Sequence, residues 1–331
     1  MQSGRVIDIH LVQSNEVKSS YHMELEGLQR AVSNLKKEGT SITEIITDRH
    51  LQIQKWIREN LPETRHSFDV WHIAKGIKKK LIGIAKEKDC GVVYSWVKSI
   101  TNNVYWSAAS SKEGDEELIV DKWKSVASHI QNVHHGHGGK FPYCQHEGLK
   151  DRDWLKPGTK ACAKVEDVIL SKRLCKDVGK MSTCHQTSTL EAFHSVINHF
   201  APKMNGFSYN GQLCRQHIAA MHFNENINRK NAYTQDGTKK IKISFPKFKM
   251  DNDNSVKTVR EEMTFTYVDA LITETMKICT HQKKMDLQTP VPPPLTALKR
   301  KPCKQEALSQ LTSRFKKIKR CLEEDLKVHM K

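Results

Sequence analysis

Two acidic side chains, Asp48 and Glu191, lie where an enzyme acting on phosphodiester bonds would place them. Asp48 follows a short apolar run, Ile42–Ile46, and Glu191 lies in a later stretch with helical apolar spacing. Converging carboxylates can hold two divalent metal ions, which activate a water or a 3′-hydroxyl and stabilise the leaving oxygen. By spacing alone the pair is weak evidence for a Mg²⁺- or Mn²⁺-dependent site, because a chain of this length contains many acids separated by such intervals.

Asp69 and His72 form a second acid and histidine combination, in a segment with strand character that runs from His66 to His72. Strand ends are where α/β folds place site residues. Asp48 and Asp69 would therefore contribute to one site from two strands. Two roles are open for Asp69 and His72: direct participation in the site, or support for packing and for the orientation of Asp48.

A polar, glycine-rich loop holds a third set of chemically active residues. Its nitrogen and sulfur donors are His134, His137, Cys144 and His146. Four such donors can form a tetrahedral structural zinc site, and glycines between them permit tight turns. The alternative is a polar surface loop, since this Cys/His order is not a common zinc-finger spacing.

Hydrophobic periodicity predicts the elements that would position the acids. Alternating β-branched residues predict a strand over Val6–Val12, and helical spacing predicts a helix over Tyr21–Lys37. A strand ending at Asp48, a helix over His50–Asn60 and a strand over His66–His72 follow. The order strand, helix, strand, helix, strand predicts a mixed α/β core.

The rest of the chain is predicted to be mostly helical. Helical spacing recurs in the segments 73–89, 92–108, 117–133, 151–180, 187–201 and 209–226. The tryptophans of this helical block are expected to pack in a core. Further on, 239–249 is predicted to form a short strand pair, and 259–277 one more strand or helix.

Composition points to a polyanionic partner. The 331 residues carry a formal net charge of +17, and lysines and arginines that neutralise phosphates release condensed counterions. DNA is the expected partner, and a merely soluble basic protein is the alternative. No apolar run long enough for a membrane span and no secretory leader are found. Nine cysteines without a regular framework favour a reducing compartment.

Four sequence blocks resemble one protein family. They are TDRH (47–50), FDVWHIAKGIKKKL (68–81), WLKPGTKA (154–161) and LEAFHSVINHFAPK (190–203), the last followed by FSYNGQ. They closely resemble the catalytic domain of Kolobok-like DNA transposases and of the animal proteins derived from them. The resemblance runs from about Gly4 to Phe248.

The resemblance implies an α/β fold: a truncated RNase H-like core, a mixed sheet with helices, interrupted by a large helical insertion. Asp48 then resembles the second catalytic carboxylate and Glu191 the third, while Asp69 and His72 resemble the D-x-x-H element beside the active site. Similar family members also show a His, Cys and His pattern in the glycine-rich loop. The implied divisions are 1–80 (first part of the core), 81–183 (insertion), 184–230 (last core helices), 231–287 (C-terminal extension) and 288–331 (proline-rich linker and basic tail).

The chain departs from the family at its start. The family's first carboxylate lies two strands before the equivalent of Val6–Val12, so Asp8 is not that acid and is expected to face solvent. A THAP-type zinc finger, often found ahead of such domains, is also absent. We therefore expect a transposase-derived nucleic-acid-binding protein, catalytically inactive through loss of the first carboxylate. The alternatives are an active DDE transposase, if the sequence is a truncated gene model, and a basic helical interaction scaffold.

Basic clusters follow the proline-rich segment TPVPPP (289–294), in a tail expected to be disordered or helical. The clustered residues are Lys299, Arg300, Lys301, Arg314, Lys316, Lys317, Lys319 and Arg320. This arrangement resembles a bipartite nuclear import signal, which predicts a nuclear protein, and the same charges could neutralise DNA phosphates. The alternative is an amphipathic helix whose apolar side packs on a partner. Because DDE transposases usually act as multimers, a homo-oligomer is possible.

Overall fold

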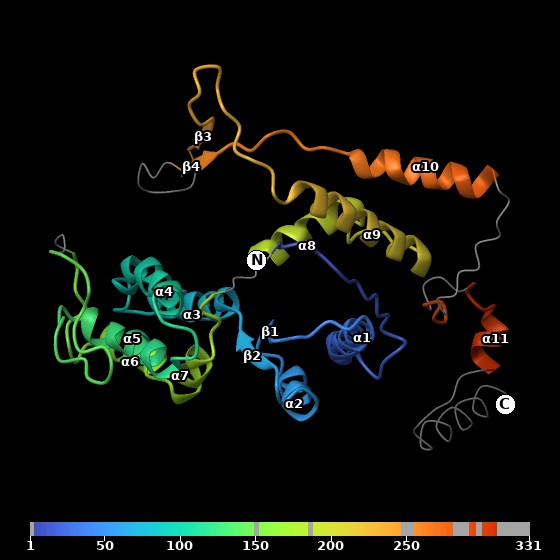
Figure 1. The fold of residues 1–331 in the computed structure, drawn as a ribbon. Coiled ribbons are helices and arrows are strands. Elements are labelled where there is room, and N and C mark those ends of the chain that lie inside the picture. The colour runs from blue at the N-terminus through green and yellow to red at the C-terminus, as the bar shows by residue number, and fades with distance from the viewer. Residues whose placement is uncertain are drawn as a thin grey trace, which may run out of the picture.

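The computed structural model describes residues 3–148, 152–184, 188–245, 255–280, 291–295 and 300–309. The chain is a mixed α/β protein in which helices predominate and the strands form two small sheets (Figure 1). Within the described ranges, every helix is too short or too polar to cross a bilayer.

A parallel strand pair forms the centre of the N-terminal part. Strand β1 (Glu44–Thr47) pairs in parallel with β2 (Arg65–Phe68). Helix α2 (Leu51–Asn60) makes the crossover that parallel strands require. Helix α1 (Met23–Lys37), preceded by the 3-10 turn η1 (Ser20–His22), packs beside α2. Their shared core consists of Val32, Ile53, Ile57 and Leu61.

A later segment adds a third position to this sheet. Met181 forms a parallel bridge with Phe68 of β2. The backbone N–H of Phe68 donates to the carbonyl of Lys180 at 2.7 Å, and the N–H of Ser182 donates to the carbonyl of Phe68 at 3.1 Å. The sheet therefore joins the N-terminal strands to the residues that lead into the helix carrying Glu191.

The prediction of a strand over Val6–Val12 is wrong. The described part of the chain offers this segment no strand partner, and its backbone is bound by a side chain instead: Asn224 exchanges two hydrogen bonds with Val6. Val6 and Ile9 pack against a core that contains Phe193 and Phe223. The alternating pattern thus reflects one apolar side packed on helices, without a second strand.

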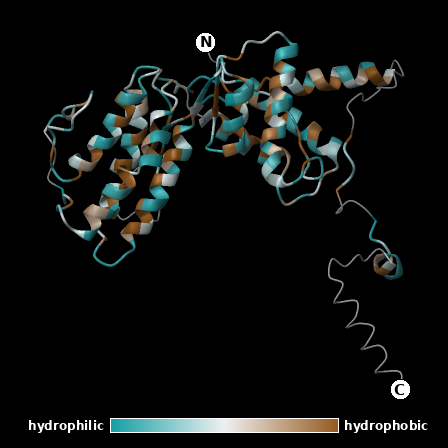
Figure 2. Ribbon diagram, turned by 90° about the horizontal axis from the view of Figure 1, so that it is seen from below, coloured by the Kyte–Doolittle hydropathy of each residue, from teal (hydrophilic) through white to brown (hydrophobic). Residues whose placement is uncertain are grey.

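Five helices form the central block. They are α3 (Val70–Ala85), α4 (Val93–Ala109), α5 (Glu116–His129), α6 (Lys160–Ile169) and α7 (Lys172–Gly179). Figure 2 shows hydrophobic and hydrophilic residues alternating along the helical ribbons, as expected of helices with one buried side. Helix α3 runs across residue 80, which is the boundary implied by the family resemblance between the first part of the core and the insertion.

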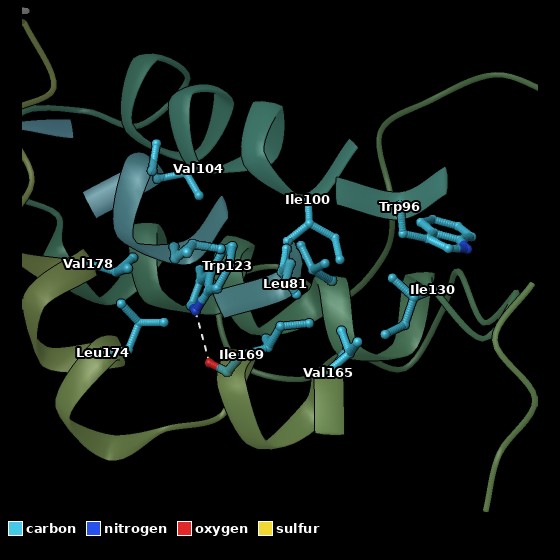
Figure 3. Close-up of a cluster of buried hydrophobic side chains, with 14 of the residues drawn as sticks. Leu81, Trp96, Ile100, Val104, Trp123, Ile130, Val165, Ile169, Leu174 and Val178 are labelled. Carbon is cyan, nitrogen blue, oxygen red and sulfur yellow. Dashed lines mark hydrogen bonds between the residues drawn. The ribbon is translucent and has the colours of Figure 1, made fainter. Parts of the chain in front are cut away.

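Buried tryptophans hold this block together. Trp96 and Trp123 are both 0% exposed and lie among aliphatic side chains such as Leu81 (Figure 3). The indole N–H of Trp123 donates to the carbonyl of Ile169 at 2.9 Å, which satisfies its polar atom inside the core. The predicted packing role is confirmed for these two residues, whereas Trp106 is 36% exposed.

Four helices and two strands follow in the described part of the chain. They are α8 (Ser188–Phe200), α9 (Tyr209–Asn226), β3 (Ile241–Ser244), β4 (Ser255–Thr258), α10 (Thr266–Thr280) and α11 (Lys304–Ser309). Helices α8 and α9 pack together. The prediction of a strand pair within 239–249 is correct only for β3, because its partner β4 lies outside that range, at Ser255–Thr258. For the segment 259–277 the sequence allows both a strand and a helix, and this segment forms most of helix α10. Of the basic tail clusters, Arg300 and Lys301 are described, and the others lie outside the described residues.

Candidate functional site

Asp48 and Asp69 lie at one edge of the parallel strand pair. Thr47 is opposite Phe68 in the register, so the next residue on each strand is an aspartate. The backbone N–H of Asp69 donates to the carbonyl of Thr47 at 2.9 Å. The two acids therefore follow the carboxyl ends of neighbouring strands, the usual place for site residues in such sheets. We call Asp48 and Asp69 the acidic edge.

Asp69 begins a helix, which corrects the prediction of a strand as far as His72. Its side chain accepts a hydrogen bond from the N–H of Trp71 at 3.2 Å, as the N-cap of α3. Its other oxygen lies 2.6 Å from Nδ1 of His72. The chain turns here because an N-cap aspartate satisfies an orphan N–H of the first turn. Asp69 is 1% exposed. Burial of Tyr105 raises the pKa of that residue, and the negative charge of Asp69 raises it further.

Asp48 also makes a local turn. Its Oδ1 accepts from the N–H of His50 at 3.0 Å, just before α2 begins. The His50 ring stacks on Tyr21, with centroids 4.2 Å apart. Arg49 forms an ion pair with Asp177 of α7 at 3.1 Å. The TDRH segment is therefore fixed on both sides, to the N-terminal helices and to the central block.

Glu191 lies in the first turn of α8, beside a surface hollow that also borders His194, Asn198 and Lys203. Among the described residues, Asp48, Asp69 and Glu191 do not form a group of donors within reach of one ion. Both oxygens of Asp69 already serve local hydrogen bonds. The structure thus places Asp48 and Asp69 at one edge of the strand pair and Glu191 at the start of another helix, without gathering the three around one ion position.

A different donor group does converge. It consists of His129, His134, Cys144 and His146. Their ligand atoms all lie within 4.8 Å of one another, compared with roughly 3.3–3.8 Å in a tetrahedral site with zinc bonds of about 2.0–2.3 Å. Three imidazoles and one thiol are donors of the kind that zinc prefers. A small inward movement of the side chains would complete the site.

A hairpin-like loop brings these donors together. His135 and Tyr143 form an antiparallel bridge, and the N–H of Cys144 donates to the carbonyl of His134 at 2.9 Å. Gly136, at φ 77°, allows the sharp turn inside this loop. His129 reaches the same point from the last turn of α5. The result is one donor from a helix and three from the loop that follows it.

In two of the histidines, one ring nitrogen is hydrogen-bonded to an oxygen, which is the usual arrangement for a histidine that binds a metal through its other nitrogen. Nε2 of His134 lies 2.9 Å from Oδ1 of Asn132, while its Nδ1 is buried without a hydrogen-bond partner. Nδ1 of His146 lies 2.8 Å from the carbonyl oxygen of Glu147. Metal-bound imidazoles commonly donate their other N–H to such oxygens. The orphaned Nδ1 of His134 is the atom that a metal ion would satisfy.

The electrostatics favour the ligand form of the histidines. Burial, and then the neighbouring His134 and His146, lower the pKa of His129 to about 4. Burial and His146 also lower the pKa of His134. These imidazoles are therefore neutral near pH 7, as metal binding requires. Burial raises the pKa of the Cys144 thiol, and bound zinc would reverse that shift by stabilising the thiolate.

His137 belonged to the donor set expected from the sequence, and the structure places it beside the group. Its Nε2 lies 3.2 Å from Sγ of Cys144, and its ring stacks on Phe141 with an angle of 7° between the planes. His129 takes its place in the group, with Nδ1 3.5 Å from the same sulfur. The sequence signal that was missed is a histidine at the end of an amphipathic helix, five residues before the first loop donor.

An apolar cavity of about 230 Å³ borders the donor group. Its walls include Trp96, Trp106 and Phe141, together with the donors His129, Cys144 and His146. Three of the four donors can therefore be approached from one side. Trp154 lies on the group as well, with its ring centroid 5.9 Å from that of His129 and 5.6 Å from that of His134.

Comparison of the chain with protein-family models, with curated proteins and with solved structures found no match.

Proposed function

We propose that this chain is a nuclear, transposase-derived protein that binds duplex DNA without cutting it. The proposal rests on the sequence resemblance to Kolobok-like transposases, on the charge of +17 and on the surroundings of the acidic edge. Under this proposal β1, β2 and the Met181 segment belong to an RNase H-like core. The helical block between Asp48 and Glu191 is the insertion.

The observation that carries DNA binding is the charge of α3, which starts at the acidic edge. Its exposed basic residues are Lys75, Lys78, Lys79 and Lys80, and the helix contains no Asp or Glu. Lys75 also lies over the ring of Trp71, with Nζ 4.3 Å from the centroid. A row of lysines without intervening carboxylates attracts phosphates and releases their counterions.

The acid geometry supports binding without cleavage. Cleavage by two metal ions requires carboxylates that reach both ions. In the part of the chain that the structure describes, Asp48, Asp69 and Glu191 do not gather around one ion position. Asp69 instead orients Trp71 and His72 at the start of α3. The acids that resemble the family's catalytic residues would then stabilise local structure.

The metal centre has a structural role in this proposal. His129, His134, Cys144 and His146 would supply all four ligands of a tetrahedral zinc ion, and a site closed in this way leaves no position for a reacting water. Bound zinc would tie the end of α5 to the 134–146 loop. It would thereby stabilise the helical block.

The test measures binding of the full chain to a fluorescently labelled DNA duplex by anisotropy at several salt concentrations. The variant replaces the four α3 lysines by alanine: Lys75, Lys78, Lys79 and Lys80. A control variant removes the same charge from the exposed lysines Lys18, Lys36, Lys37 and Lys55. In the α3 variant we expect weaker binding and a smaller salt slope, by about 0.9 for each phosphate that is no longer neutralised. Absence of DNA binding by the unaltered chain would refute the proposal, and equal effects of both variants would remove α3 from it.

A further inference from the structure

A small antiparallel ribbon lies apart from the elements discussed above. β3 pairs with β4, and the neighbouring segment around Ala232 adds a third position, with the N–H of Lys240 donating to the carbonyl of Ala232 at 2.8 Å. The N–H of Val259 donates to the carbonyl of Lys240 at the same distance. In Figure 1 this ribbon projects away from the central block and from α1 and α2.

Two lysines face each other across the ribbon. Lys242 is directly opposite Lys257 in the register. Side chains of alternate residues share a face, so Lys240 lies on the same face as this pair. All three lysines are exposed. In the part of the chain that the structure describes, none of the three ammonium groups forms an ion pair.

The opposite face of the ribbon is also open. Its side chains include Ile241, Ile243 and Val256, which are 54%, 49% and 61% exposed. A ribbon that buries neither face gains little from the hydrophobic effect, and isolated strand pairs are marginal in water. Like charges directly opposite each other weaken it further. A polyanion lying over the lysine face would remove that repulsion.

We propose that the lysine face of the ribbon, formed by Lys240, Lys242 and Lys257, binds the phosphate backbone of duplex DNA. The inference deepens the proposed function and rests on it, because it assigns a second DNA contact remote from the acidic edge. A two-stranded ribbon is narrow enough to enter or follow the major groove, which is about 12 Å wide. Three exposed ammonium groups on one face supply contacts that fix position without reading sequence.

The experiment compares three variants of the full chain with the unaltered chain, using anisotropy of a labelled duplex over a range of salt. The ribbon variant replaces Lys240, Lys242 and Lys257 by alanine. A second variant replaces the same three residues by arginine, which keeps the charge. The control replaces the exposed residues Lys18, Lys36 and Lys55 by alanine.

We expect the alanine ribbon variant to bind DNA at least tenfold more weakly and its salt slope to fall by about 2.7, or 0.9 for each of three phosphates. The arginine variant should bind as the unaltered chain does, and the control should bind less than threefold more weakly. Circular dichroism should give equal melting temperatures, because all the substituted side chains are exposed.

Several outcomes would overturn the inference. If the alanine ribbon variant binds as the unaltered chain does, the ribbon makes no DNA contact, and the proposed function stands on α3. If its binding is weakened no more than that of the control, the effect belongs to net charge alone. Duplex RNA or polyglutamate that displaces the labelled DNA as well as unlabelled DNA does would assign the face to another polyanion. No DNA binding by the unaltered chain would refute the proposed function, and this inference with it.

Discussion

The side-chain amide of Asn224 exchanges two hydrogen bonds, each 2.7 Å long, with the backbone of Val6, 218 residues away in the sequence. An amide side chain that both donates and accepts satisfies the backbone N–H and carbonyl, as a neighbouring strand would. Helix α9 thus fastens the start of the described chain to the α8–α9 pair. This contact explains how a segment with strand periodicity is held without a strand partner.

Replacing Asn224 by alanine should release this N-terminal segment. The N–H and carbonyl of the half-buried Val6 would lose their side-chain partner, at a cost below the roughly 1–3 kcal/mol of a fully buried unsatisfied group. We expect faster amide hydrogen exchange of residues 3–13, measured by mass spectrometry. Asn205→Ala, at an exposed position, is the matched control. Unchanged exchange in Asn224→Ala would show that packing of Val6 and Ile9 alone holds the segment.

Zinc content tests the donor group directly. Purified protein loaded with zinc and then dialysed should retain about one ion per chain, by elemental analysis. Cys144→Ser and His129→Ala should lose it, because each removes one of four ligands. His137→Ala should keep it, since His137 lies outside the group. Loss in His137→Ala with retention in His129→Ala would instead support the donor set expected from the sequence.

The zinc-free protein should lose stability in acid through His129. The pKa of this side chain is lowered from 6.5 to about 4 in the folded chain, so the folded state holds it neutral. The contribution of neutral His129 to the free energy of unfolding is fully present above pH 6.5. It is lost as the pH falls from 6.5 towards 4. We expect the melting temperature of the chelator-treated protein to fall over this range, and to fall less in His129→Gln. Identical curves for both proteins would contradict this origin of the acid sensitivity.

Core packing of the helical block predicts a large effect at Leu81. This side chain is 0% exposed, so Leu81→Ala should lower the free energy of unfolding by about 2–5 kcal/mol through reduced burial and a cavity. Leu170→Ala, at a position 49% exposed, should change it by less than about 0.5 kcal/mol. Urea denaturation followed by circular dichroism measures both. Similar decreases would mean that Leu81 is not part of a cooperative core.

Much of the helical structure could be predicted because it depends on local periodicity. The helix expected over Tyr21–Lys37 begins only two residues later, and the one expected over Tyr209–Asn226 matches α9. An apolar stripe at helical spacing marks the buried face whichever helix covers it. Long-range partners carry no such signal. The side chain that holds Val6 is distant in sequence, so alternation at Val6–Val12 was indistinguishable from a strand.

The site could be predicted in part for the same reason. His134, Cys144 and His146 share one loop, and their proximity follows from short sequence separation. His129 joins them because the loop folds back onto the end of α5, which no spacing rule reveals. At Asp69, strand and N-cap preferences compete within one short segment. The capping bond from the Trp71 N–H, together with the side-chain contact to His72, decides the outcome.

The most direct test of DNA binding without cleavage is a single gel measurement of plasmid binding and plasmid integrity. The full chain is incubated with supercoiled plasmid and Mg²⁺ or Mn²⁺, at protein concentrations that retard the DNA. A parallel set is treated with detergent and protease to release the DNA before electrophoresis. We expect retarded plasmid that runs as intact supercoiled DNA after release. Nicked or linear product with the unaltered chain, absent with Asp48→Ala and Glu191→Ala, would contradict this expectation and identify an active metal-dependent nuclease.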